Sequence, residues 1–200
     1  MNTTRMEAFT DGVLAIIITI MVLELKVPHG TGLEVLRPLL PVLASYVLSF
    51  VYIGIYWNNH HHMLHACHRV TGSVLWANLH LLFWLSLVPF ATGWMGENHF
   101  ATMPTAAYGV VLLMAGVAYL ILERRIIAAE GEASLVKRAI GADWKGKISA
   151  VLYALAIGLA FVSPWISLAI YAAVAITWFV PDRRIERRLQ TGDPEDAGRS

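Results

Sequence analysis

The sequence lacks much of what soluble proteins and nucleic-acid-binding proteins need. It contains a single cysteine, Cys67, so no disulfide can form within the chain. Only 14% of its 200 residues are charged, and the 15 Lys and Arg nearly balance the 14 Asp and Glu. The net charge of +1 supplies no basic surface for phosphate groups. We therefore expect no nucleic-acid partner.

Catalytic and nucleotide-binding motifs are also missing. The sequence has no HExxH zinc motif, no GxSxG nucleophile motif and no Walker A loop. The GTG at residues 30–32 lacks the third glycine of a dinucleotide-binding fingerprint. We predict that the protein is not an enzyme and that it needs no cofactor.

Apolar side chains are abundant instead. They make up 57% of the chain, and the mean hydropathy is +0.58, more apolar surface than a soluble core of this size buries. A helix of ~20 residues crosses the ~30 Å hydrocarbon layer of a membrane. Six apolar blocks cover approximately residues 7–27, 39–58, 74–95, 104–122, 148–163 and 165–180, of which the last two are short. The sequence predicts an all-α integral membrane bundle of six transmembrane helices in one domain, residues 1–182.

Basic residues predict the orientation of this bundle. If the N-terminus is cytoplasmic, all of the 15 Lys and Arg except Lys26 and Arg37 fall in cytoplasmic segments. Both termini are then cytoplasmic. In the tail, residues 183–200, the RRIERR segment marks the cytoplasmic end of the last helix and contacts anionic lipid head groups, and the remainder is expected to be disordered.

Two local signals refine the picture at the ends of the domain. Glu7 and Asp11 precede the first apolar block and no cleavage site follows it, so we expect this block to remain in the mature chain. Ser163 followed by Pro164 separates the last two blocks, and this pair is typical of a helix start. The last two blocks are therefore predicted to form a tight helical hairpin.

Ionisable and polar side chains at membrane depth need partners, because an unpaired charge there costs at least ~2.5 kcal/mol. Arg5 and Asp11 are six residues apart, about 240° around a helix, so they do not face each other. We expect their partners in the WNNHHH run at residues 57–62 and in Asn78 of the third block. The pattern predicts a polar lock between helices; the alternative is a direct role in transport or proton sensing.

The histidines of NHHHMLHACHR suggest a second kind of site. His61, His65 and His68 follow i, i+4, i+7 spacing on one helical face, which is typical of metal ligands, and Cys67 lies close by. No second ligand group with matched spacing accompanies them in the sequence. A membrane metal- or haem-binding protein using the histidines from His60 to His68 is therefore the weaker interpretation.

Three motifs in order along the first half of the chain resemble a known family. Arg5-x-x-x-Phe9-Thr10-Asp11 opens the first block, YWNNHHHML follows at residues 56–64, and LWANLHLLFWLSLVPFATGWMG at residues 75–96. These motifs resemble the transmembrane protein 175 family, the endolysosomal potassium channels and their prokaryotic relatives. Thr10 stands where the family usually has serine, and the last three blocks match in hydropathy alone.

The resemblance implies a potassium-selective cation channel with K⁺ as its permeant ion. It implies a homotetramer in a prokaryotic plasma membrane, contacting lipids, with a central pore lined by the first helix. The residues of the implied lock are Arg5, Phe9, Thr10, Asp11, Trp57, Asn58, His60, His61 and Asn78. The alternative is a proton- or cation-coupled secondary transporter in which Asp11 and the histidines relay protons.

The same resemblance places the narrowest apolar constriction at Ile16. Helical spacing then adds Thr19, Ile20 and Leu23 to the same stripe. Ile17 and Ile18 are expected to face lipid. The sequence has no TVGYG-like filter loop. Selectivity is therefore expected from partial dehydration in an apolar ring, with the Thr19 hydroxyls replacing some lost water ligands.

Overall fold

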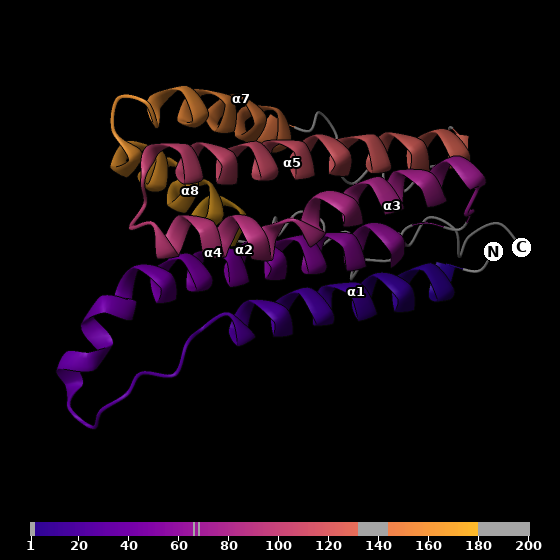
Figure 1. Ribbon diagram of the computed structural model, residues 1–200. Helices are drawn as coiled ribbons and strands as arrows, with labels where there is room; N and C mark the ends of the chain where they lie inside the picture. Colours follow the sequence, from indigo (N-terminus) through magenta and orange to yellow (C-terminus); the bar gives the residue numbers. More distant parts are fainter. Residues whose placement is uncertain (1–2, 66, 68, 132–143, 180–200) are drawn as a thin grey trace, which may run out of the picture.

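The computed structural model describes residues 3–65, 67, 69–131 and 144–179, which are helical apart from short connections (Figure 1). The predicted tail from residue 183 and His68 lie outside the described residues. No β-strand occurs among the described residues. The helices are α1 (Thr3–Leu23), the 3₁₀ helix η1 (Leu33–Leu39), α2 (Leu40–His65), α3 (Gly72–Ser86), α4 (Val88–Glu97), α5 (Thr102–Glu130), α7 (Trp144–Leu159) and α8 (Pro164–Phe179).

Among the described residues, four helical stretches are long and apolar enough to cross a membrane: Thr3–Leu23, Leu33–His65, Gly72–Glu97 and Thr102–Glu130. These stretches match the first four apolar blocks, so the all-helical membrane architecture is confirmed. Helices α7 and α8 have 16 described residues each and form the predicted hairpin. Ser167 Oγ donates a hydrogen bond to the Ala156 carbonyl across that hairpin at 2.6 Å.

The third apolar block, predicted as one helix, is divided in two. Helix α3 ends at Ser86, and α4 begins at Val88. Pro89 has no backbone N–H to continue the hydrogen-bond ladder of α3, and the Ser86 hydroxyl bonds back to the Phe83 carbonyl at 2.7 Å. The chain therefore changes direction at Leu87 while the two pieces still span one layer.

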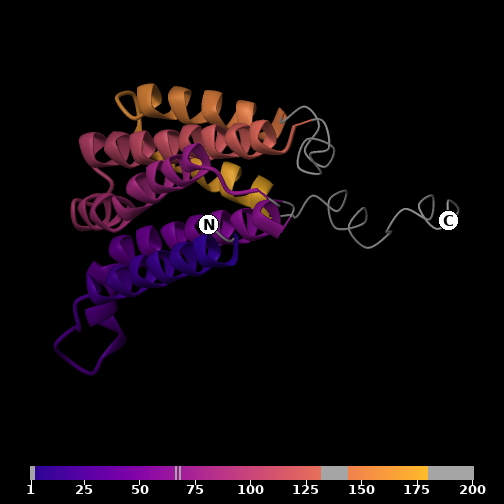
Figure 2. The ribbon, with the colours of Figure 1, turned by 90° about the vertical axis from the view of Figure 1, so that its right-hand side faces the viewer.

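Helix α5 lies at the centre of the bundle and packs against α3, α4, α7 and α8, whereas α1 packs against α2, α3 and α4. Figure 2 shows α1 and α2 on one side of the molecule and α5 and α7 on the other. Hydroxyl groups pair inside this apolar core, because a buried polar group without a partner is costly. Ser49 Oγ contacts Thr92 Oγ1 at 2.6 Å and Tyr108 Oη at 2.9 Å, and Tyr52 Oη donates to the Tyr171 carbonyl at 2.6 Å.

The contact between α5 and the α7–α8 hairpin depends on a glycine. A Cβ atom at Gly109 would collide with the Tyr171 hydroxyl and lie 2.9 Å from Ile157 Cγ1, whereas at Gly116 the nearest atom would be 3.8 Å away. We expect Gly109→Ala to lower the free energy of unfolding by about 1–3 kcal/mol through overpacking. Gly116→Ala, in the same helix, should be neutral or stabilising by up to about 1 kcal/mol. Thermal unfolding of both purified variants in detergent measures the difference, and equal melting temperatures would contradict this packing.

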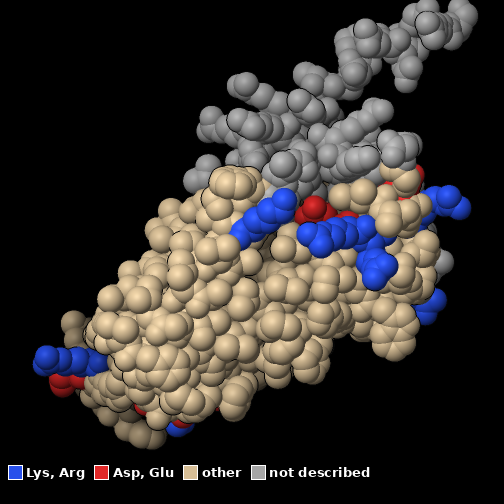
Figure 3. All heavy atoms as spheres, turned by 90° about the horizontal axis from the view of Figure 1, so that it is seen from above, with Lys and Arg blue, Asp and Glu red and all other residues tan. Residues whose placement is uncertain are grey.

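Charged side chains lie toward the ends of the molecule. Figure 3 shows Lys and Arg gathered toward one end and a small group at the other, with a broad uncharged surface between them on this face. At the end opposite the start of α1, Lys26 Nζ contacts Glu97 Oε1 at 2.8 Å. That carboxylate raises the pKa of Lys26 because the hydrogen bond and the negative charge stabilise the ammonium form. The pair links the segment after α1 to the end of α4.

Candidate pore-lining helix and its polar anchor

Helix α1 has one packed face and one open face. The packed face consists of side chains three or four positions apart, as an α-helix requires: Met6, Thr10, Leu14, Ile17 and Met21. On the open face Ile16 is 59% exposed, Ile20 42% and Leu23 81%, and Thr19 is exposed beside them. The structure therefore places all four residues of the predicted constriction on the same unpacked stripe of the single chain.

The expectation that Ile17 faces lipid is wrong. Its side chain is only 3% exposed and belongs to the core between α1 and its neighbours, and Ile18 is half-buried against that core. The reason is the 3.6-residue period, which turns Ile17 about 100° from Ile16 and onto the packed face.

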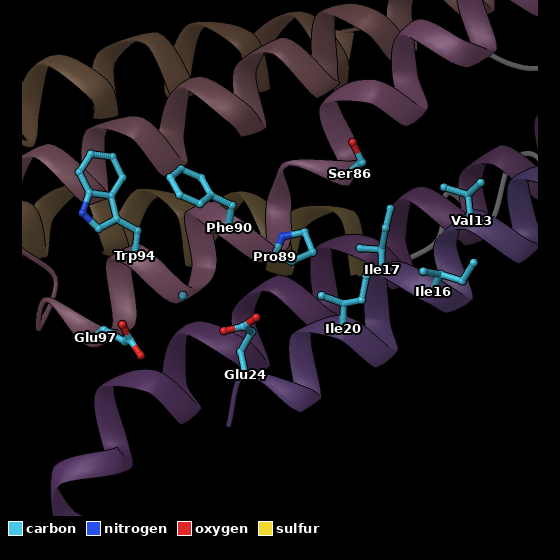
Figure 4. Close-up of a pocket in the computed structure, with 11 residues that line it drawn as sticks. Val13, Ile16, Ile17, Ile20, Glu24, Ser86, Pro89, Phe90, Trp94 and Glu97 are labelled. Atoms are coloured by element: carbon cyan, nitrogen blue, oxygen red, sulfur yellow. The ribbon is translucent and has the colours of Figure 1, made fainter. Parts of the chain in front are cut away.

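Two residues of the open stripe border an apolar groove of about 790 Å³ between α1 and the α3–α4 segment. Ile16, Ile17 and Ile20 line the α1 side. Figure 4 shows these side chains along the groove, with the carboxylates of Glu24 and Glu97 at one end of it.

Thr19 is the one hydroxyl on the open stripe that was predicted to act on ions. Its Oγ1 donates a hydrogen bond to the Ile16 carbonyl of the preceding turn at 2.9 Å. A hydroxyl has one proton and two acceptor lone pairs, so this bond uses the proton and leaves the lone pairs free. Thr19 consequently presents an oxygen acceptor outward without breaking the helix.

Two polar contacts join the N-terminal half of α1 to the end of α2. Trp57 Nε1 donates to Asp11 Oδ1 at 3.0 Å, and His61 Nδ1 donates to Glu7 Oε1 at 2.7 Å. The helices run in opposite directions, so four residues back on α1 correspond to four residues forward on α2 (Figure 1). The two contacts therefore join successive turns of the same helix pair, and we call them the two rungs between α1 and α2.

A buried chain of hydrogen bonds connects three helices behind these rungs. His60 Nε2 donates to Asn78 Oδ1 at 2.8 Å, and Asn78 Nδ2 donates to Thr10 Oγ1 at 2.9 Å. The three residues come from α2, α3 and α1, and each is at most 2% exposed. Asn78 is the central member because its amide uses both its carbonyl and its amino group.

Other residues predicted for the lock lie outside these contacts. Within the described part of the chain, no hydrogen bond or ion pair joins Arg5, Phe9 or Asn58 to another helix. Arg5 is exposed, Phe9 is 53% exposed, and Asn58 is half-buried.

Glu7 is the partner that the sequence reasoning missed. It was treated there as an acidic residue before an apolar block, without a partner of its own. Its spacing of four residues from Asp11, matched by the spacing of four between Trp57 and His61, was the available signal. His65, one further turn along α2, lies beside His61 with ring centroids 4.8 Å apart and the ring planes tilted by 34°.

Comparison with known proteins identifies the family of this chain. The family model described as "Endosomal/lysosomal potassium channel TMEM175" matches residues 5–89. A protein of Chryseobacterium sp. (strain P1-3) that is named a potassium channel is 55% identical over 95% of this chain and 99% of its own length. The chain belongs to the TMEM175 family.

Further relatives extend this TMEM175 likeness to the whole bundle. A potassium channel of Streptomyces collinus is 31% identical over 86% of this chain and 89% of its own. The crystal structure of a lysosomal potassium-selective channel TMEM175 homolog from Chamaesiphon minutus superposes with a TM-score of 0.74 at 27% identity, covering 89% of this chain and 96% of that one. The TMEM175 family model, which matches residues 5–89, includes every residue of the two rungs and of the buried hydrogen-bond chain through Asn78. The family is one of channels rather than enzymes.

Proposed function

We propose that this protein is a potassium-selective cation channel, formed by four copies around a central pore that α1 lines. The observation that carries the proposal is the open stripe of Ile16, Thr19, Ile20 and Leu23, since the packed face of α1 is anchored to α2 and α3. The potassium-channel names of relatives up to 55% identical support the permeant ion.

The anchor gives the stripe a fixed direction. The rungs from Asp11 and Glu7 and the buried chain through Thr10 set the rotation of α1 about its own axis. A helix so held presents Ile16 and Ile20 outward from its own subunit. In a closed four-fold ring, equivalent stripes converge on the symmetry axis.

Selectivity in this proposal comes from dehydration followed by partial replacement of water. A narrow ring of isoleucines strips water from a passing ion, and the loss costs more for sodium, which holds its water more tightly. Four Thr19 oxygens, each with its proton already donated to the Ile16 carbonyl, then serve as acceptor ligands. No P-loop filter is needed in this mechanism.

The proposed setting is a prokaryotic plasma membrane, with both termini cytoplasmic and lipids around the bundle. The start of α1, the end of α2, the start of α3 and the end of α5 lie at the same end of the bundle (Figure 1). By the helix bounds, Arg5, Arg69, Arg124 and Arg125 belong to these helix ends or to the connection between α2 and α3, which supports this orientation.

Reconstitution into liposomes tests the function. Potassium gradients should drive a rapid flux that does not saturate in the physiological range, and sodium should permeate less. Flux that saturates with ion concentration and requires a counter-ion would indicate a secondary transporter instead. An absorption spectrum of the purified protein decides whether haem is bound.

The Thr19 hydroxyl provides a specific prediction for selectivity. We expect Thr19→Val to lower the potassium-to-sodium permeability ratio severalfold, because the methyl group removes four acceptor oxygens from the pore. Thr177→Val in α8 is the matched control, since Thr177 is also exposed and also donates to its own helix, to Ala173 at 2.8 Å. Reversal potentials under biionic conditions give the ratio. An unchanged ratio in Thr19→Val would remove Thr19 from the mechanism.

A further inference from the structure

The contact between Glu7 and His61 continues into a cluster with the composition of a metal site. Candidate ligand atoms of Glu7, His61 and His65 all lie within 4.8 Å of one another. Glu7 comes from α1, and the two histidines occupy consecutive turns of α2. The sequence pattern had placed His61 and His65 on one face without a partner group, and the fold supplies that group from another helix.

From this juxtaposition we propose that Glu7, His61 and His65 bind a transition-metal ion of the zinc class, distinct from the permeant ion, which bridges α1 and α2. The i, i+4 histidine pair on a helix is a spacing that places two imidazoles on one metal. Two imidazole nitrogens and one carboxylate oxygen match a three-ligand zinc site with an open fourth position. Calcium and magnesium prefer all-oxygen ligand sets and are disfavoured here.

The cluster is open to solvent, and its ligand atoms lie at nearly the spacing that a zinc ion requires. The side chains of His61 and Glu7 are 41% and 23% exposed, and His65 is exposed, so an ion reaches them from solvent. Ligands about 2.0–2.1 Å from a tetrahedral zinc are about 3.3 Å from each other. The His61–Glu7 distance of 2.7 Å is shorter and the cluster limit of 4.8 Å is longer, so small side-chain rotations close the site.

Calorimetric titration of the EDTA-treated, intact channel with zinc chloride tests the proposal. We expect one zinc ion per chain, no heat with magnesium chloride, and a higher melting temperature with zinc because the ion joins two helices. Absence of zinc binding to the wild-type protein would overturn the proposal.

Three variants locate the ion. Glu7→Gln and His65→Ala should each weaken zinc binding at least about 10-fold. His62→Ala is the matched control: it removes a neighbouring exposed imidazole that is outside the ligand cluster, and it should bind zinc like wild type. His65 is exposed, so its variant is expected to fold, which elution as a tetramer checks. Binding that survives both Glu7→Gln and His65→Ala would place the ion elsewhere and overturn the bridge between α1 and α2.

Discussion

Replacing Ile16 with asparagine is expected to raise the potassium current and to weaken selectivity against sodium. Ile16 is 59% exposed on the open stripe of α1. In the proposed tetramer, four such side chains meet on the axis and form a constriction too apolar to hold water. An amide retains water there and lowers the barrier to ion entry. A barrier lower by about 1.4 kcal/mol gives a tenfold larger current. Single-channel recording and liposome flux, normalised to the amount of tetramer, measure the change.

Two controls separate a pore effect from damage to the fold. Ile17→Asn buries an amide in the core, because Ile17 is 3% exposed, so it should lower stability rather than raise the current per channel. Ile176→Asn in α8 makes the same substitution at a position that is 68% exposed, and its current should match wild type. A leak through Ile176→Asn or Ile17→Asn with a normal Ile16→Asn current would assign the pore to another face.

Replacing Asn78 with alanine is expected to have the largest effect on stability. The substitution removes the acceptor of His60 and the donor to Thr10 together, and both of these partners are buried. Each unsatisfied buried group costs about 1–3 kcal/mol, so we expect a loss of about 2–3 kcal/mol after relaxation. Thermal unfolding and the tetramer fraction on size-exclusion chromatography report the loss.

Asn59→Ala provides the matched control for this prediction. The Asn59 amide donates to the Ile55 carbonyl of its own helix at 2.8 Å, so its removal breaks a hydrogen bond within α2 rather than one between helices. We expect a melting temperature close to wild type. Equal losses in Asn78→Ala and Asn59→Ala would show that the buried chain does not hold the three helices together.

The polar contacts of α1 are expected to differ in their contribution to stability. Asp11 is half-buried and accepts one hydrogen bond from an exposed tryptophan, whereas Thr10 is 1% exposed. The sequence predicted Asp11 as a charged member of the polar lock. In the structure of the single chain, Asp11→Ala removes one partly exposed rung, so its effect on folding should be smaller than that of Asn78→Ala.

Composition was sufficient for most of the helices, whereas the open stripe also required the family resemblance. Apolar blocks of membrane length predicted α1, α2 and α5, because hydropathy directly reflects what a lipid layer tolerates. The family resemblance placed Ile16, the 3.6-residue period then added Ile20 and Leu23 on the same side, and the structure leaves all three exposed. Motif order predicted the family, and the relatives confirm it.

Details that depend on pairing between helices were not available from one sequence. The break at Leu87 looked like continuous apolar helix because Pro89 is tolerated in membrane helices. The contact of Glu7 with His61 depends on the register of two antiparallel helices, and the matched four-residue spacings are compatible with that register without fixing it. The burial of Ile17 depends on which face of α1 meets α2 and α3, and periodicity alone gives the angle between faces but not the partner of each.

The buried chain through Asn78 also imposes an order on biosynthesis. Thr10 is synthesised 68 residues before Asn78, an interval of about 3–14 s at 5–20 residues per second. Trp57 and His61 leave the ribosome earlier than Asn78, so the two rungs between α1 and α2 are available while Thr10 still has no partner on α3. The helical hairpin of α1 and α2 is therefore the first assembly that the growing chain can make, and arrival of α3 completes the hydrogen bonds that fix α1 in place.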